Sequence, residues 1–147
     1  NNIFQEDALS FMKRTADYYD LINCGDVIEH FEKDKALELI DLCLEKSNFL
    51  LINIPIGNDW HQDAVNNNDY EKHRSVWKIS DFRKYSNCII KNFKDIELRK
   101  FSVILLSGDK IDLTKTYGKH FIAKSILKNK MKLNYLVEQI ENRKSQK

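Results

Sequence analysis

The sequence contains few residues that interrupt regular secondary structure. Among its 147 residues there are one proline, Pro55, and four glycines. Because proline and glycine end helices and strands, each of these positions indicates a turn or an element boundary. A chain of this length is sufficient for one domain with a buried core. Its 42% hydrophobic and 31% charged residues are typical of a globular protein.

A strong charge of either sign is also missing. The 24 Lys and Arg residues and the 22 Asp and Glu residues leave a net charge of +2. A charge this small does not favour a nucleic-acid partner. No apolar run approaches the roughly 18 residues of a membrane span, and no signal peptide is visible, so we expect no membrane association.

Cysteine is sparse and shows no paired spacing. The three cysteines, Cys24, Cys43 and Cys88, lie far apart in the sequence. This distribution indicates reduced thiols and predicts a cytoplasmic location, because disulfide frameworks and zinc ribbons place their cysteines in closely spaced pairs. Nothing in the sequence indicates an oligomeric state.

Two largely apolar runs, residues 18–24 and 49–54, flank a segment with helical periodicity. Apolar residues recur at helical spacing from Ala36 to Leu44, and Asp34 is a candidate N-cap. The apolar runs are typical of strands that are buried on both faces. A strand, a helix and a strand in this order predict a βαβ unit with parallel strands.

Further elements are predicted on either side of this unit. Before it, we expect the end of a strand at residues 2–4 and a short helix over residues 8–12. After it, we expect a long polar loop (57–75), a helix from Ser80 to about Asn87, strands at 96–106 and 119–127, and a helix at 130–143. The predicted fold class is α/β with a mainly parallel sheet.

A functional site is expected where the first strand of the βαβ unit ends. Gly25 terminates this strand and is followed by a polar turn that contains Asp26, Glu29 and His30. Parallel sheets bind ligands beyond the carboxyl ends of their strands. The loop over residues 57–75 leaves the neighbouring strand, and loops of this length are commonly functional lids or else disordered.

These residues resemble the C-terminal half of the class I S-adenosylmethionine-dependent methyltransferases. The segment Tyr19-Asp20-Leu21-Ile22 followed by Asp26-Val27-Ile28-Glu29-His30 is similar to the fourth strand of that family and its "DxxEH" turn. Asn53-Ile54-Pro55 is similar to the end of the fifth strand. The last two predicted strands are similar to the sixth and seventh strands, which close the family's sheet as an antiparallel hairpin.

The resemblance implies a Rossmann-like, mainly parallel sheet flanked by helices, with an antiparallel last strand. It covers about residues 2–127, so we expect a partial methyltransferase-like domain over residues 1–127 and a C-terminal helix over residues 128–147. The family's glycine-rich loop and its ribose-binding acid would precede residue 1. We therefore expect either an N-terminally truncated chain or a catalytically silent interaction domain. Truncation is favoured, because the chain begins at Asn1 without methionine and the retained parallel strands would leave an open sheet edge.

The resemblance also implies which residues contact the cofactor, S-adenosylmethionine. Asp7 and the backbone of Ala8 correspond to the adenine-binding positions, and Cys24, Gly25 and Asp26 to the positions near the methionine end. Two simpler interpretations stay open. An acidic residue that opens a helix can be an N-cap, and a small residue such as cysteine can be plain core.

His73, His30 and Glu71 are the candidate catalytic bases. Methyl transfer from a sulfonium requires mainly that the acceptor be aligned and its proton removed. The expected acceptor is an oxygen or nitrogen of a small molecule or saccharide. If the long loop and the turn form one site, His73 should lie close to His30 and Asp26 in space.

The alternative is a metal-assisted methyltransferase that acts on the 2′-hydroxyl group at the 3′ end of an RNA. Asp26, Glu29 and His30 could bind Mg²⁺ together with His73. The segment His73-Arg74-Ser75-Val76-Trp77 resembles the "HxxxW" segment of the small-RNA 3′-end 2′-O-methyltransferases, whose magnesium is held by two acids and two histidines. Such a metal would orient the acceptor and lower its pKa. Of the two alternatives, a pocket without metal is favoured.

Overall fold

The computed structural model describes residues 2–65, 67–108, 111 and 113. The chain divides into two compact units, residues 1–112 and 113–147, and the elements below belong to the first. The predicted strand at 119–127 and helix at 130–143 lie outside the described residues. The described helices and strands are α1 (Ala8–Arg14), β1 (Tyr19–Gly25), α2 (Lys33–Glu45), β2 (Ser47–Pro55), β3 (Cys88–Lys94) and β4 (Lys100–Ser107). None of the described helices is long and apolar enough to cross a membrane.

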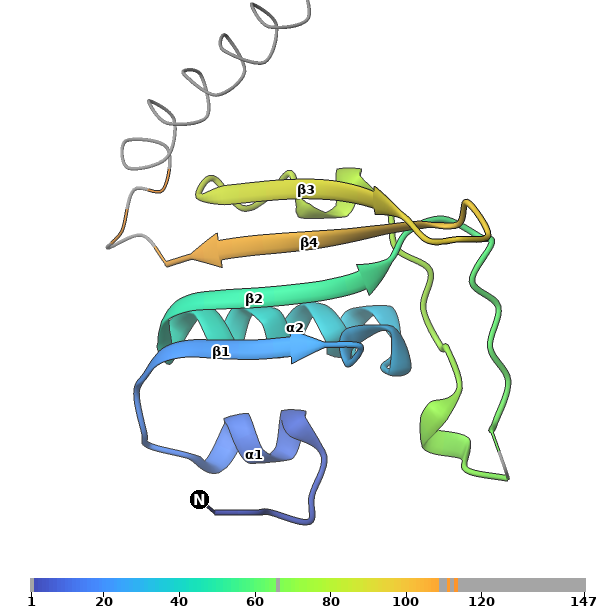
Figure 1. Ribbon diagram of the computed structural model, residues 1–147. Coiled ribbons are helices and arrows are strands. Elements are labelled where there is room, and N and C mark those ends of the chain that lie inside the picture. The colour runs from blue at the N-terminus through green and yellow to red at the C-terminus, as the bar shows by residue number, and fades with distance from the viewer. Residues whose placement is uncertain (1, 66, 109–110, 112, 114–147) are drawn as a thin grey trace, which may run out of the picture. The chain divides into compact units, whose positions relative to one another are not determined.

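These elements form an α/β fold with a four-stranded mixed sheet in the order β1-β2-β4-β3 (Figure 1). β1 and β2 are parallel, with Leu21 opposite Phe49 and Cys24 opposite Ile52. This pairing confirms the predicted βαβ unit. β4 runs antiparallel to both of its neighbours, β2 and β3. The carboxyl ends of β1 and β2 therefore lie at the same edge of the sheet.

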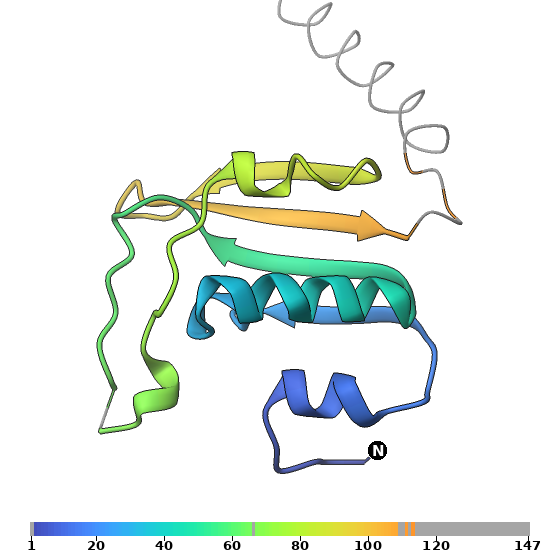
Figure 2. The same ribbon diagram turned by 180° about the vertical axis from the view of Figure 1, so that it is seen from behind.

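Helix α2 covers one face of β1 and β2 (Figure 2). It begins at Lys33, one residue before the predicted cap Asp34, and its N-cap is Glu32. One stripe of its surface is fully buried against apolar residues of β2. The buried residues of α2 are Ala36, Leu39, Ile40 and Cys43, and those of β2 are Leu50, Ile52 and Ile54. Burial of these side chains, at roughly 1.5–3 kcal/mol for each large one, holds the unit together.

The strand predicted at residues 96–106 is shorter in the structure. Residues 96–99 form the turn of the β3–β4 hairpin, where the Asp95 carboxylate accepts the N–H groups of Glu97 and Arg99. Ile96 is 99% exposed and Leu98 adopts a positive φ of 63°. The alternation of Ile96 and Leu98 imitates a strand, but the turn hydrogen bonds determine the backbone. β4 is also antiparallel, whereas the prediction gave that orientation to residues 119–127 alone.

Three further expectations differ from the structure. β3 was not predicted, because only its first residues are half-buried and its periodicity is weak. Residues 2–4 form no strand, and the Phe4 ring contacts the Phe11 ring of α1 instead. The helix expected from Ser80 is a 3₁₀ turn, Ile79–Phe82, in which the Asp81 carboxylate caps the N–H of Lys78.

Candidate functional site

The turn after β1 carries Glu29 into the interior. Asp26 adopts a positive φ of 51° and donates its N–H to the Asn53 carbonyl at the end of β2, at 3.0 Å. The chain then forms a 3₁₀ turn, Ile28–His30. Ile28 is fully buried in the core and anchors this turn. Glu29, the next residue, is buried as well, at 1% exposure.

The long loop returns to this turn. The Glu29 carbonyl oxygen accepts the N–H groups of Arg74 at 2.8 Å and Ser75 at 3.1 Å. Within the loop, the His73 N–H donates to the Gln62 carbonyl oxygen at 3.0 Å. The outgoing and returning arms are thus joined to each other and to the end of β1 (Figure 1).

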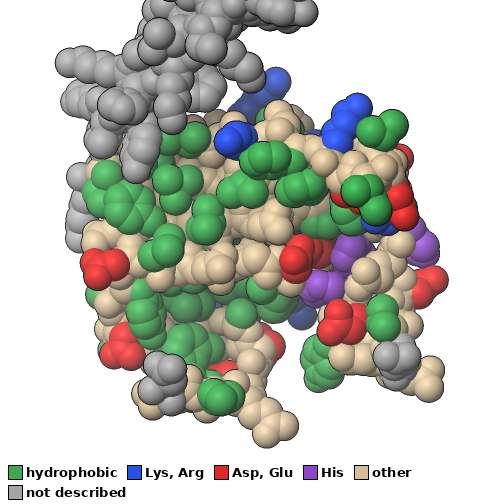
Figure 3. All heavy atoms as spheres, viewed as in Figure 1, with side chains coloured by type: hydrophobic (Ala, Val, Ile, Leu, Met, Phe, Trp, Pro, Cys, Tyr) green, Lys and Arg blue, Asp and Glu red, His purple; other side chains and the backbone are tan. Residues whose placement is uncertain are grey.

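Three side chains with metal-ligating or proton-accepting atoms meet here. One such atom from each of Glu29, His30 and His73 lies within 4.8 Å of the other two. The His30 and His73 ring centroids are 5.1 Å apart, with the rings edge to face. Figure 3 shows histidine and acidic side chains at the notch between the loop and the sheet. The expected proximity of His73 and His30 is confirmed.

The Glu29 side chain has an unusual environment for a carboxylate. It is 1% exposed, and neither carboxylate oxygen has a hydrogen-bond partner among the described residues. Burial raises the pKa of Glu29 to about 7, and the Asp26 charge adds to the rise. A buried and unpaired carboxylate is costly, so it marks a position where a proton, a cation or a ligand group completes the site.

Both histidines are oriented by backbone carbonyls. His30 Nδ1 lies 3.2 Å from the Lys72 carbonyl oxygen, and His73 Nδ1 lies 2.7 Å from that of Trp60. A carbonyl can only accept, so in the neutral imidazole Nδ1 carries the proton. Nε2 of each ring therefore keeps its lone pair, which can accept a proton or bind a metal.

The cluster borders two cavities. One, of about 560 Å³, is lined by residues that include Asp7, Ala8, Asp26 and His30. The other, of about 110 Å³, is lined by residues that include Glu29, Trp60, His73 and Trp77. Arg74 lines both cavities, so they are adjacent. Three of the five candidate cofactor residues therefore share one cavity.

In this structure Asp7 is a helix cap. Its two carboxylate oxygens accept the backbone N–H of Ser10 at 3.0 Å and the Ser10 hydroxyl at 2.6 Å. These bonds hold the pKa of Asp7 below its usual value. The N-cap interpretation is therefore correct, and the carboxylate still borders the larger cavity.

The other two candidate cofactor residues lie elsewhere. Cys24 is buried in the core, where its hydrogen bond with Cys43, together with burial, raises the pKa of the Cys43 thiol well above its usual range. It also lines a third cavity, of about 500 Å³, between α1 and β1. Gly25 is exposed and is not among the residues that line these cavities.

Two candidate site residues do not join the cluster. Glu71 is exposed in a 3₁₀ turn, Asp69–Glu71, where the Gln62 side chain bonds its backbone carbonyl. The Glu71 carboxylate is not among the converging atoms, so the geometry does not support Glu71 as the base. Asp26 is exposed and outside the group of converging atoms. The negative charge of Asp26 nevertheless acts on Glu29, because it raises the pKa of the Glu29 carboxyl group.

The sequence interpretation missed the roles of Asn53 and Arg74. The Asn53 Oδ1 atom is buried and has no partner among the described residues. A polar residue inside an otherwise apolar strand was the available signal for it. Arg74 pairs with Asp69 and borders both cavities, which depends on the path of the loop and has no sequence signal.

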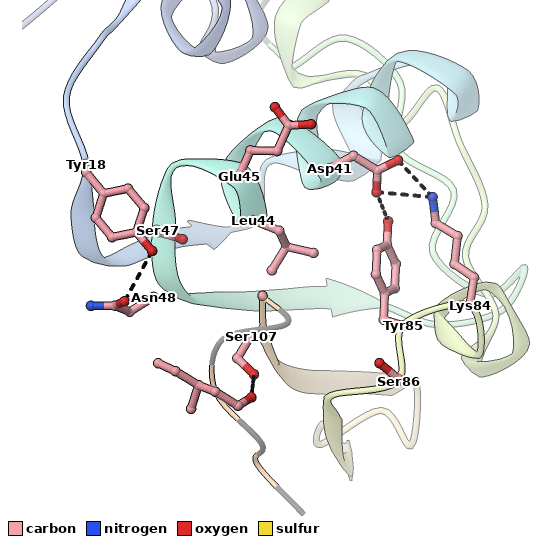
Figure 4. A pocket seen from close by; sticks show the side chains of 12 residues that line it. Tyr18, Asp41, Leu44, Glu45, Ser47, Asn48, Lys84, Tyr85, Ser86 and Ser107 are labelled. Atoms are coloured by element: carbon pink, nitrogen blue, oxygen red, sulfur yellow. Dashed lines mark hydrogen bonds and ion pairs between the residues drawn. The ribbon is translucent and has the colours of Figure 1, made fainter.

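A fourth cavity, of about 380 Å³, lies beside the C-terminal end of α2 (Figure 4). Three of its charged and phenolic groups, Asp41, Lys84 and Tyr85, are paired with one another. The Asp41 carboxylate accepts from Lys84 at 3.0 Å and from the Tyr85 hydroxyl at 2.8 Å. Burial and the Asp41 bond raise the pKa of Tyr85 well above its usual range. This cavity therefore offers less for ligand chemistry than the Glu29 cluster.

Comparison with known proteins adds no assignment to this site. A scan against protein-family models finds no match, and a search of curated proteins finds no match either. The functional argument therefore rests on the α/β fold and on the geometry of the cluster.

Proposed function

We propose that this chain is part of an S-adenosylmethionine-dependent methyltransferase that acts on an oxygen or nitrogen of a small molecule or saccharide. The observation that carries the proposal is the position of the Glu29, His30 and His73 cluster between two adjacent cavities. A methyl transferase needs one cavity for the sulfonium cofactor and one for the acceptor, with a proton acceptor where they meet.

The sheet topology supports the same proposal. The resemblance implies a Rossmann-like sheet that closes with an antiparallel hairpin, and β3 and β4 form such a hairpin beside β2. The hairpin comes one element earlier in the chain than the sequence suggested. The site also lies at the carboxyl ends of the parallel strands β1 and β2, which is where such sheets bind ligands.

The larger cavity suits the cofactor, and the smaller one suits the reacting part of the acceptor. Asp7 and Ala8 border the first, as the resemblance implies for adenine binding. The Asp26 carboxylate borders it as well and would attract the positive sulfonium. The second cavity has aromatic walls, Trp60 and Trp77, beside His73.

His73 is the proposed general base. The acceptor oxygen or nitrogen attacks the methyl carbon, and the bond between carbon and sulfur breaks with its electrons returning to sulfur. The acceptor proton passes to His73 Nε2, because Nδ1 is already committed to the Trp60 carbonyl. The products are the methylated acceptor, S-adenosylhomocysteine and a proton.

Calorimetric titration of the full-length protein with S-adenosylhomocysteine tests this proposal. We expect binding, and we expect methyl transfer to a hydroxyl or amine acceptor to fall at least tenfold in His73→Gln. The matched control is Tyr85→Phe, which alters the cavity beside α2 and should leave transfer unchanged. Absence of heat with the intact protein would contradict the proposal and support a silent interaction domain.

A further inference from the structure

We propose that the acceptor of this site is a protonated amine whose nitrogen binds among Glu29, His30 and His73. The inference rests on the proposed methyltransferase function and deepens it, because it selects nitrogen over oxygen as the atom that is methylated. One nitrogen or oxygen atom from each of the three side chains lies within 4.8 Å of the other two. Glu29 and His73 border the smaller cavity and His30 borders the larger one, so the amine would lie where the two cavities adjoin.

The cluster offers hydrogen-bond acceptors and no donors. The Glu29 carboxylate only accepts, and neither of its oxygens has a partner among the described residues. His30 and His73 each direct Nδ1 to a backbone carbonyl oxygen, at 3.2 and 2.7 Å, which leaves Nε2 as an acceptor. An ammonium group has three N–H donors and no acceptor, whereas a hydroxyl group has one donor. The three acceptors therefore match a protonated amine better than an alcohol.

The spacing of the three atoms also fits an ammonium group. Charge-assisted hydrogen bonds of about 2.7–2.9 Å at tetrahedral angles separate two acceptors of one ammonium by roughly 4.4–4.7 Å. The three atoms of the cluster lie within 4.8 Å of one another. One ammonium nitrogen can thus bond all three side chains with little rearrangement.

The Glu29 carboxylate also lacks a positive partner. Its side chain is 1% exposed and unpartnered among the described residues. Arg74 lines the smaller cavity, but its guanidinium is paired with Asp69. Burial raises the pKa of Glu29 to about 7, as expected for a carboxyl group without a compensating charge. A buried carboxylate requires such a charge, and a bound ammonium group supplies it.

A carboxylate beside the nitrogen also assists methyl transfer. His73 Nε2 removes one proton from the bound ammonium, and the neutral amine attacks the methyl carbon of the sulfonium. The bond between carbon and sulfur breaks with its electrons returning to sulfur, so the positive charge moves from sulfur to nitrogen. The products are the N-methylammonium ion, S-adenosylhomocysteine and a proton on His73. Glu29 stabilises the charge that forms on nitrogen, whereas it would oppose the negative charge of an alkoxide.

Titration of the full-length protein with methylammonium, without the cofactor, tests the proposal. This probe is small enough for the smaller cavity, of about 110 Å³, and at about pH 8 it is protonated while Glu29 is ionised. The measured signals are the indole N–H resonances of Trp60 and Trp77, which line that cavity. We expect saturable shifts with methylammonium. Methanol, which has no charge, and tetramethylammonium, which has no N–H donor, should bind roughly tenfold more weakly or less well still.

Three variants locate the binding site of the probe. Glu29→Gln keeps the size of the side chain and removes its charge, so methylammonium binding should weaken by roughly tenfold or more. His30→Leu removes one acceptor and should weaken binding by roughly threefold or more. Asp63→Asn is the matched control, because it removes one negative charge from an exposed position in the same loop. It should leave the methylammonium affinity unchanged.

Three results would overturn the proposal. They are the absence of saturable shifts with methylammonium, an equal affinity for either control probe, and an equal affinity in the wild type and Glu29→Gln. The indole spectrum shows whether each variant is folded. If Glu29→Gln does not fold, His30→Leu and the two control probes decide. Because S-adenosylhomocysteine binding is measured separately, failure here is distinct from failure of the methyltransferase proposal.

Discussion

The backbone carbonyl of Glu29 accepts the N–H of Arg74 at 2.8 Å, which joins the turn after β1 to the returning arm of the long loop. This one contact sets two features of the site. It places His73, the residue before Arg74, beside His30, and it closes the loop over the Glu29 side chain. The cluster therefore exists because of the path of the backbone.

Glu29 makes the stability of the protein depend on pH. The pKa of Glu29 is about 7 in the folded state against an ordinary value of 4.5, so the folded state binds this proton more tightly. Its contribution to the free energy of unfolding is complete below pH 4.5 and is lost as the pH rises through 7. The loss amounts to about 3 kcal/mol. Asp26 and His73 are the titratable neighbours that modify it.

Urea unfolding of Glu29→Gln and of the wild type between pH 5 and 8 measures this effect. The variant should lose the decline with pH, because the amide does not titrate. Glu45→Gln, at an exposed position on α2, should keep it. Identical pH profiles for the wild type and Glu29→Gln would show that the buried carboxyl does not control stability.

Asp7 allows capping to be separated from cofactor binding. Asp7→Ala should destabilise the protein by about 1 kcal/mol through loss of the α1 cap, whereas Asp7→Ser should keep most of that stability. Both variants lose the carboxylate at the larger cavity and should weaken binding of S-adenosylhomocysteine by about 1–3 kcal/mol. Chemical denaturation and calorimetry provide the two measurements. Full affinity in Asp7→Ser would remove Asp7 from the cofactor site.

Leu98 occupies a backbone conformation that suits asparagine better. Its φ is 63°, and its side chain is 70% exposed, so little apolar burial is lost on replacement. Leu98→Asn should stabilise the hairpin by about 0.5–1 kcal/mol, because asparagine tolerates the left-handed region. Ile96→Asn, at a 99% exposed position without a positive φ, is the control and should have little effect. A shift in melting temperature that is equal for both variants would contradict this reason.

Trp77 lines the smaller cavity of the site. It is buried, stacks on Phe82 at 5.3 Å between ring centroids, and lies under the Lys33 ammonium at 3.5 Å. Trp77→Ala should cost about 3–5 kcal/mol of unfolding free energy because it leaves a large cavity. Trp77→Phe should cost less, because the phenyl ring fills part of the same space. If Trp77→Ala were neutral in thermal melts, the ring would not be part of the core.

The sequence by itself determined the βαβ unit and the kind of residues at its end. Residues 49–54 are apolar apart from Asn53, and a strand of this kind must be covered, which the helical spacing from Ala36 to Cys43 provides. These signals are local. They predict elements, and the rule that parallel strands share an edge then predicts that His30 and His73 approach each other.

Only the tertiary structure decided the hairpin, the burial of Glu29 and the members of the side-chain cluster. The register of β3 on β4 depends on long-range pairing, and the turn at Asp95 overrode the alternation of Ile96 and Leu98. The same dependence on distant contacts applies at the site. Glu29 is buried because a loop more than forty residues away bonds its carbonyl, while Asp26, three residues earlier, stays exposed. Backbone hydrogen bonds between distant segments have no pattern in the sequence, so the burial of Glu29 and the exposure of Asp26 could not be predicted from it.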